Sequence, residues 1–244
     1  MRLKGGSTFA VLALCLGGCV THPTRSIDAF ADRSGNNSFE ILNRSFASDG
    51  LVLPVVQDRQ DSAASCGAHA LASVINYWTP GATSGDAIYA QTPPADPHGY
   101  SLAELQALAS RHGLLASSVR MDKAGIIAEL EHGRPVLVPV IVPAFFVDRR
   151  SVPGANAPVV GVVSSALRNQ MARVSEMTHM AMVNHYVVVV GYDQDQFAIV
   201  EPVLGFRTIT QERLERYREG FQDAALVMSG PHPPGAAQTP NASR

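Results

Sequence analysis

Three residues have side chains of the kinds that covalent catalysis uses: one cysteine, one histidine and one glutamate. Cys66 stands directly before an apolar run at helical spacing, which places its sulfur at a helix N-terminus, where unpaired N–H groups and the helix dipole favour a thiolate. His185 begins an apolar, strand-like run, and an imidazole on a strand can serve as the base for a sulfur on a helix. Glu201 ends the following strand-like run, and its carboxylate is expected to hold the imidazole through Nδ1–H.

An oxyanion formed at such a site needs a hydrogen-bond donor besides the backbone. Two glutamines precede the cysteine, Gln57 and Gln60, and either side-chain amide is placed to donate. Gly67 follows the cysteine directly, so we expect it to let a substrate approach the helix backbone closely. Together these residues predict attack of a thiolate on a carbonyl carbon.

The N-terminal segment has the order of a secretory signal. Residues 1–18 contain a short positive start, an apolar stretch too short to span a bilayer, and two glycines before Cys19. The ending Leu16-Gly17-Gly18-Cys19 resembles the lipobox of bacterial lipoproteins, which implies that Cys19 is lipidated and becomes the mature N-terminus. Val20 stands where inner-membrane lipoproteins carry aspartate, which favours the periplasmic face of the outer membrane. The alternative is an ordinary signal peptide cleaved near Ala10 to Gly18.

An exported location makes a single thiol unusual. Cys15 leaves with the signal and Cys19 carries lipid, so Cys66 has no intramolecular partner under oxidising conditions. A buried, inert thiol is the plain alternative. A zinc site is a further alternative, with the candidate ligands Cys66, His69, His179 and His185. His69 itself is expected to pack in or near the helix.

The charge balance argues against a nucleic-acid partner. The chain of 244 residues has a formal net charge of −2, and loss of Arg2 and Lys4 with the signal makes it about −4. Lys123 is then the one lysine left, and no basic stripe is formed. The remaining length suits one domain with a large insertion.

Hydrophobic periodicity predicts an α+β fold, with helices first and an antiparallel sheet after them. Helices are expected to begin at Cys66, at the capping box Ser101-Leu-Ala-Glu104 and after the cap Asp122. The other expected elements are an edge strand in 51–56, strands at 135–142, 185–192, 197–201 and 224–228, and a short helix at 211–217.

These features divide the chain into four parts. Residues 1–18 are the signal and residues 19–48 a membrane tether and lead-in. Residues 49–229 form the catalytic domain, in which 143–183 is a long insertion able to shape a cleft. Residues 230–244, rich in proline and alanine, form a disordered tail.

Two blocks of sequence resemble the papain-like bacterial cysteine peptidases of the bacteriocin-processing type, which cut after double-glycine leaders. They are "Gln60-x5-Cys66-Gly67-Ala68" and "Asn184-His185-Tyr-Val-Val-Val-Val-Gly191 … Glu201-Pro202". In that family a glutamine stands six residues before the cysteine and the acid sixteen after the histidine, so the resemblance selects Gln60 over Gln57. It spans about residues 51–228, apart from the insertion. The family's usual acid is aspartate, and Ser65 and Ala68 replace a frequent aspartate and proline.

The resemblance implies a papain-like fold and a membrane-anchored cysteine endopeptidase that needs no metal or organic cofactor. Cys66 would be the nucleophile, His185 the base, Glu201 the orienting acid and Gln60 the oxyanion donor. Family members that trim leaders sit on transporters inside the cell, whereas this protein is expected to face outward. The expected substrate is therefore an already exported protein or peptide. The alternatives are a papain-type acyl or peptidyl transferase, like transglutaminase or phytochelatin synthase, and a non-catalytic peptide-binding lipoprotein.

Overall fold

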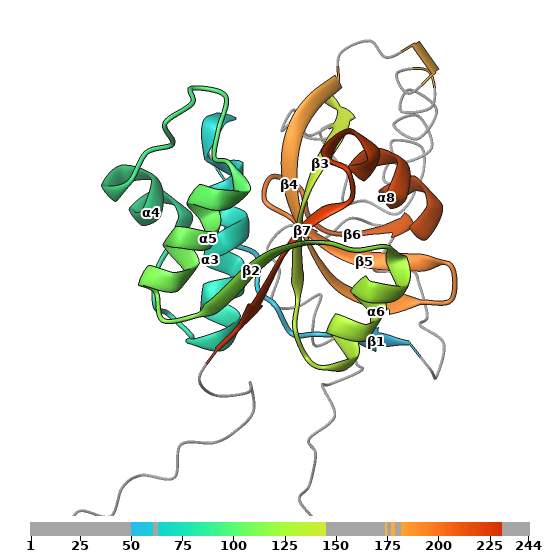
Figure 1. Cartoon of the computed structure of the whole chain (residues 1–244), viewed down its shortest axis with the longest axis horizontal. Helices are drawn as coiled ribbons and strands as arrows, with labels where there is room; N and C mark the ends of the chain where they lie inside the picture. Colours follow the sequence, from blue (N-terminus) through green and yellow to red (C-terminus); the bar gives the residue numbers. More distant parts are fainter. Residues whose placement is uncertain (1–49, 61–62, 145–173, 175–176, 179–181, 231–244) are drawn as a thin grey trace, which may run out of the picture.

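The structure is a computed structural model in which residues 50–60, 63–144, 174, 177–178 and 182–230 are described. Figure 1 shows three helices, α3, α4 and α5, grouped on one side, with most strands and the helices α6 and α8 on the other. The predicted signal, tether and tail lie outside the described residues, except for Gly230, as does most of the predicted insertion. Among the described residues, no helix has the length and apolar character needed to cross a membrane.

Helix α3 (Cys66–Trp78) is the central helix of the core. Twelve of its 13 residues are buried, so its small alanines and its larger apolar side chains are packed on nearly every side. It packs against the sheet strands β4 and β3. The predicted start at Cys66 is confirmed, and the end falls before Thr79-Pro80-Gly81, where Gly81 has a φ of 74°.

Two further helices on this side have capped N-termini. In α4 (Gly85–Gln91) the Ser84 side chain accepts a hydrogen bond from the Ala87 N–H. Helix α5 (Leu102–Arg111) has the predicted capping box, since Ser101 and Glu104 each accept from the other's backbone N–H. Both helices are thus fixed by local polar residues.

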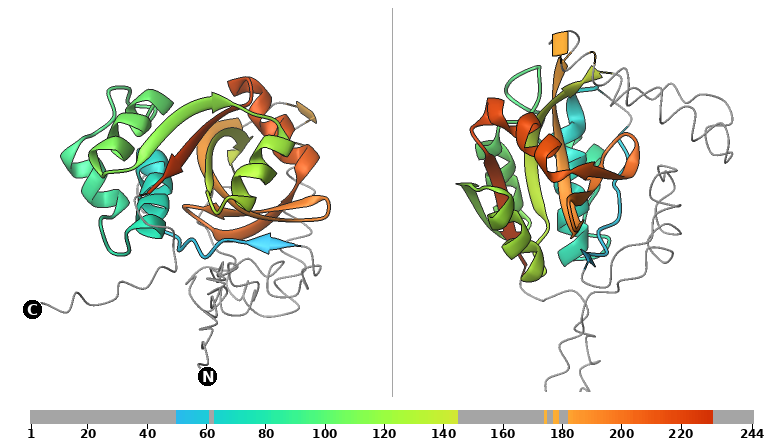
Figure 2. Two further views of the ribbon diagram at one scale, coloured as in Figure 1. Left: turned by 60° about the horizontal axis from the view of Figure 1, so that its bottom comes forward. Right: turned by 90° about the vertical axis from the view of Figure 1, so that its right-hand side faces the viewer.

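Seven strands form one antiparallel sheet in the order β2-β7-β3-β4-β5-β6, with β1 paired to β4. Figure 2 shows that this sheet is strongly twisted. The strands are β1 (Leu51–Val52), β2 (Leu115–Arg120), β3 (Val136–Pro143), β4 (Met182–Asp193), β5 (Gln196–Glu201), β6 (Gly205–Thr210) and β7 (Ala224–Ser229). The sheet side also carries the helices α6 (Lys123–Glu131) and α8 (Gln211–Arg218). Strand β4 is central because β3 and β5 pair on its two sides.

The predicted α+β class is confirmed, and among the α-helices and strands of the described residues three were not predicted. These are α4, β2 and β6. The expectation that the helices precede the sheet is wrong in detail, because β2 lies between α5 and α6 in the chain and joins the sheet through β7. Strand β2 is exposed at most of its positions, so no apolar alternation marks it in the sequence.

Candidate active site

Cys66 is the first residue of α3, directly after a short 3-10 helix (Ala63–Ser65). Ser65 occupies the N-cap position, and its side chain makes no capping hydrogen bond to the helix. The N-terminal position predicted for the thiol is therefore confirmed, and Cys66 has an exposed fraction of 7%. A sulfur in this place lies at the positive end of the helix dipole.

His185 and Glu201 come from neighbouring strands and meet on one face of the sheet. Val188 of β4 is paired with Val200 of β5, so one step further along this register sets Glu201 opposite Val187. Residues two apart on a strand share a face, which brings Glu201 and His185 to the same side. The His185 Nε2 atom lies 2.5 Å from the Glu201 Oε1 atom.

The ring nitrogen that meets the acid differs from the one expected. We expected Glu201 to bind Nδ1–H, whereas the carboxylate accepts from Nε2–H. Nδ1 is then the nitrogen left for Cys66, which also hydrogen bonds with the ring. The reason is the position of the acid. Glu201 lies on the adjacent strand of the same sheet, and the Nε2 end of the imidazole is the end that reaches it.

The environment of His185 favours its protonated form. Burial by itself lowers the pKa of the imidazole, but hydrogen bonds and charge interactions with Cys66 and Glu201 outweigh it and raise the pKa from 6.5 to about 10. Both partners are buried, Cys66 at 7% exposure and Glu201 at 0%. This arrangement can hold a thiolate beside an imidazolium.

The Glu201 carboxylate is fixed by the turn that follows it. The backbone N–H of Val203 donates to Oε1 over 2.9 Å, and the N–H of Leu204 donates to Oε2 over 2.5 Å. With these two hydrogen bonds formed, the Oε1 atom is also directed at His185. The turn between β5 and β6 thus holds the carboxylate of the longer glutamate in the orientation that the histidine requires.

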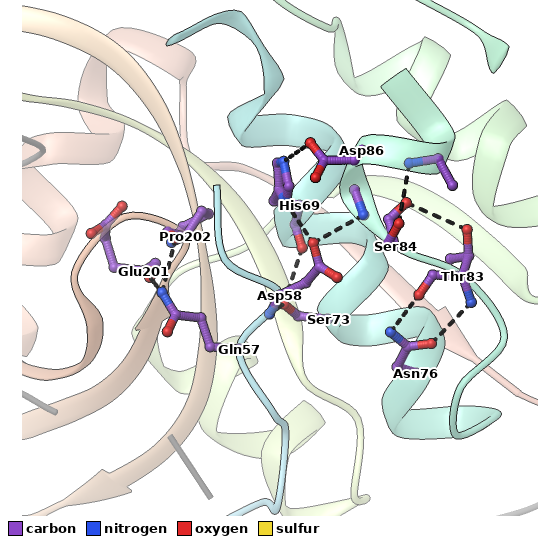
Figure 3. A network of polar contacts seen from close by, with 12 residues as sticks. Gln57, Asp58, His69, Ser73, Asn76, Thr83, Ser84, Asp86, Glu201 and Pro202 are labelled. Atoms are coloured by element: carbon purple, nitrogen blue, oxygen red, sulfur yellow. Dashed lines mark hydrogen bonds and ion pairs between the residues drawn. The ribbon is translucent and has the colours of Figure 1, made fainter. Parts of the chain in front are cut away.

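The two glutamines before the cysteine have different surroundings. The Gln57 side-chain amide donates to the carbonyl oxygens of Glu201, over 3.0 Å, and Pro202, over 2.8 Å. Figure 3 shows this amide directed at the chain between those two residues. Gln60 is buried at 4% exposure, and its backbone N–H donates to the Pro202 carbonyl over 2.9 Å. The Gln57 donors are already used by backbone, which argues against Gln57 as an oxyanion donor and leaves Gln60 as the candidate that the family spacing selects.

The structure shows a packing reason for glycine at position 67. A Cβ atom at this position would lie 3.2 Å from Tyr100 Cβ and 3.3 Å from Tyr186 Cδ2, so two rings pack against the glycine. The Tyr186 hydroxyl donates to the Tyr100 carbonyl oxygen over 2.8 Å. Burial, followed by the charges of Cys66 and Glu104, raises the pKa of Tyr186 above its ordinary value. Gly67 therefore allows close packing within the protein, and the expected approach of a substrate to its backbone stays a prediction.

His69 belongs to a separate cluster. Its Nδ1–H donates to the Asp58 carboxylate, and its Nε2 lies 3.4 Å from Asp86 Oδ1 without the alignment of a hydrogen bond. His179 of the alternative zinc set lies outside the described residues. Within the described part of the chain, no group of three or more His, Cys, Asp or Glu residues is arranged to hold a metal ion. The sequence pointed to His69 as a packed residue but contained no local signal for its partner Asp58.

The sequence of this chain matches one known protein family. A sequence model of the Peptidase_C39 like family matches residues 52–224. A search of curated proteins returned no match. Among solved structures, the peptidase domain of Streptococcus ComA is 16% identical with a TM-score of 0.49, and the match covers 71% of this chain and 97% of that domain.

Two other solved structures have a similar degree of likeness. A putative C39-like peptidase from Bacillus anthracis is 15% identical with a TM-score of 0.48, covering 75% of this chain and 98% of that one. A double glycine motif protease from an AMS/PCAT transporter, in complex with its leader peptide, is 18% identical with a TM-score of 0.42, covering 76% and 94%. The family match extends from β1 to the start of β7 and includes the cysteine, the histidine and the acid, so the chain belongs to the Peptidase_C39-like family.

Proposed function

We propose that this protein is a cysteine endopeptidase in which Cys66, His185 and Glu201 form the catalytic triad. The observation that supports the proposal best is the buried hydrogen-bonded series from thiol to imidazole to carboxylate, together with the pKa of His185 raised to about 10. A peptidase of this type needs an imidazolium beside a thiolate before substrate binds. The family membership supports the same reaction class.

The proposed reaction has two halves. The Cys66 thiolate attacks the peptide carbonyl carbon, and the resulting oxyanion accepts hydrogen bonds from the Cys66 backbone N–H and the Gln60 side chain. His185 then gives its Nδ1 proton to the leaving amine as the C–N bond breaks, which leaves an acyl-thioester. In the second half, His185 takes a proton from water and the hydroxide attacks the thioester carbon. The C–S bond then breaks, which releases the carboxylic acid product and regenerates the Cys66 thiolate beside the protonated His185. Glu201 keeps the ring orientation and stabilises the imidazolium.

We propose an exported protein or peptide as the substrate. The secretory order of residues 1–18 and the lipobox-like ending at Cys19 support a protein that acts outside the cytoplasm. Lipid on Cys19 would hold the domain at the membrane, and Val20 supports the periplasmic face of the outer membrane.

The proposed activity predicts a change in the termini of exported proteins. We expect cells with the wild-type protein to contain at least one exported protein with a new terminus that is missing when Cys66→Ala replaces it. The measurement is mass spectrometry of N-termini in the cell-envelope fraction, with equal amounts of the two proteins checked by immunoblot. The matched control is Ser65→Ala, which changes the neighbouring N-cap residue and is expected to retain cleavage. Identical termini in the wild type and Cys66→Ala would contradict the proposal.

The proposed anchor predicts a change of cell fraction. Cys19→Ser removes the acceptor of the lipid, so we expect the protein to leave the membrane fraction or to stay as an uncleaved precursor. Fractionation and labelling with a fatty-acid analogue measure both outcomes, with Cys15→Ser as the control that should change neither. A Cys19→Ser protein that still takes up label and remains in the outer membrane would show that the anchor lies elsewhere.

A further inference from the structure

Residues 57–60, here called the strap, make hydrogen bonds to the chain that ends β5. The Gln57 amide donates to the carbonyls of Glu201 and Pro202, and the backbone N–H of Gln60 donates to the Pro202 carbonyl. Three hydrogen bonds thus join the strap to the residue that orients His185 and to the proline after it. The strap holds the part of the sheet that carries the acid.

The strap is also joined to the helices, through Asp58. The Asp58 carboxylate accepts from His69 Nδ1–H of α3, and its Oδ1 accepts from the Gly85 N–H of α4 over 2.9 Å. The Asp58 backbone N–H donates to Ser73 Oγ over 2.9 Å, and that hydroxyl donates to the His69 carbonyl over 3.0 Å. Figure 3 shows Asp58 between the strap and the two helices, with Gln57 directed the opposite way toward Glu201 and Pro202.

The cluster around Asp58 is closely packed. His69 has an exposed fraction of 1% and Asp58 of 17%. A Cβ atom on Gly85 would lie 2.3 Å from two atoms of the His69 ring, so only glycine lets α4 begin this close to the imidazole. His69 lies one turn after Cys66 on the same helix. Its hydrogen bond to Asp58 therefore sets the position of Asp58 relative to the nucleophile.

We propose that Asp58 and His69 are positioning residues, which act through the strap to set the Gln60 amide and the His185–Glu201 pair against Cys66. This inference rests on the proposed function, since it assigns these residues a part in the same site. The nucleophile belongs to the helical side and the base and acid belong to the sheet. In the described chain, the strap is hydrogen bonded to both sides within four residues.

The physical reason is the short range of the interactions that maintain the imidazolium. The raised pKa of His185 depends on hydrogen bonds to partners from both sides, Cys66 of α3 and Glu201 of β5. A displacement of about 1 Å between the two sides weakens such bonds and can cost about a hundredfold in rate. Loosening the strap is therefore expected to change the titration of His185, although the strap hydrogen bonds given above go to Glu201, Pro202 and the helices.

The test compares full-length variants by two readouts. The first is the pKa of His185, measured by NMR of the ring protons. The second is the rate at which iodoacetamide alkylates Cys66 at about pH 6, where an ordinary thiol reacts slowly. We expect Asp58→Ala to move the His185 pKa down toward 6.5 and to slow alkylation by about tenfold to a hundredfold.

Two control variants separate positioning from other effects. Asn76→Ala removes hydrogen bonds with Thr83 at the same junction of α3 and α4, over 2.8 and 3.2 Å, and touches no residue of the strap. Asp86→Asn removes the other carboxylate beside His69 and leaves the strap bonds in place. Both controls are expected to stay within about twofold of the wild type in alkylation rate. If either control changes both readouts as much as Asp58→Ala does, the inference is wrong.

A second pair of variants covers the case in which Asp58→Ala does not fold. Asn can place a side-chain N–H where His69 has Nδ1–H, whereas Leu cannot. We expect His69→Asn to restore most of the alkylation rate that His69→Leu loses. Equal rates in these two variants would overturn the role of the His69–Asp58 bond.

Failure of this inference differs from failure of the proposed function. A wild type with a high His185 pKa that falls in Asp58→Ala supports the strap, even if no exported protein is cleaved. A His185 pKa that is the same in the wild type and Asp58→Ala overturns the strap, even if Cys66-dependent cleavage is found.

Discussion

Glu201 shows how backbone donors fix an acidic side chain beside a histidine. Its carboxylate accepts two backbone N–H groups, from Val203 and Leu204, and still lies 2.5 Å from His185 Nε2. These bonds hold a side chain with one more rotatable bond in a single orientation. The acceptor therefore stays in place, and the Glu201–His185 pair is one cause of the high pKa of the imidazole.

The raised pKa of His185 predicts the alkaline limit of activity. The ring must be protonated to give a proton to the leaving amine, and its pKa of about 10 keeps it protonated until the pH rises past that value. We expect kcat/KM to fall above about pH 10 in the wild type, and at a lower pH in Glu201→Gln, because the variant loses the negative charge that helps to raise the pKa of His185. Circular dichroism checks that the variant is folded. An alkaline limit that is the same in both proteins would show that Glu201 does not set this titration.

The different surroundings of the two glutamines predict different kinetic losses. Gln60→Ala removes a proposed oxyanion donor, so we expect kcat to fall by about a hundredfold with KM little changed. Gln57→Ala removes two bonds of the strap to Glu201 and Pro202, so it should lower the pKa of His185, whereas Gln60→Ala should not. Steady-state kinetics with a cleaved peptide, together with NMR titration, measure the two effects. If Gln60→Ala and Gln57→Ala change kcat equally and change the pKa of His185 equally, the roles assigned to the two glutamines are wrong.

At the scale of elements, prediction succeeded where local signals were strong. The helices α3, α5 and α6 begin where the sequence places them, and α5 has the capping box read from Ser101 and Glu104. Strand β2 was missed because only the pairing with β7 makes its exposed residues a strand. Helix α4 is seven residues long, and its one local signal is the cap at Ser84. Short or exposed elements depend on their neighbours more than on their own pattern.

At the scale of the molecule, hydrogen bonds from one buried arginine join segments that are distant in sequence. Arg218 of α8 has an exposed fraction of 0%, and its Nη2 donates to the carbonyls of Met121 and Asp223, over 2.7 Å each. These carbonyls lie just before α6 and just before β7. Burial lowers the pKa of Arg218, with nearby acids such as Asp223 acting in the opposite direction. One side chain thus holds α8 and the entries to two other elements together.

This arrangement predicts a loss of stability when Arg218 is replaced. Arg218→Met leaves two carbonyls without their charged donor, so the free energy of unfolding should fall by about 2 kcal/mol. Arg216→Met is the control, because Arg216 lies on the same helix with 46% exposure and should change stability by less than about 0.5 kcal/mol. Urea unfolding followed by circular dichroism measures both. A loss for Arg218→Met no larger than that for the control would contradict the role of these bonds.

The sequence alone determined the α+β class, the start of α3 at Cys66, and the triad candidates, because these depend on local periodicity and on spacing along the chain. The tertiary structure decided which imidazole nitrogen meets Glu201, what fills the space beside Gly67, and that Asp58 is bonded to His69. These features depend on strand register and on packing between α3, α4 and the sheet. Contacts of that kind join residues far apart in the chain or on different elements, and no short pattern of residues encodes them.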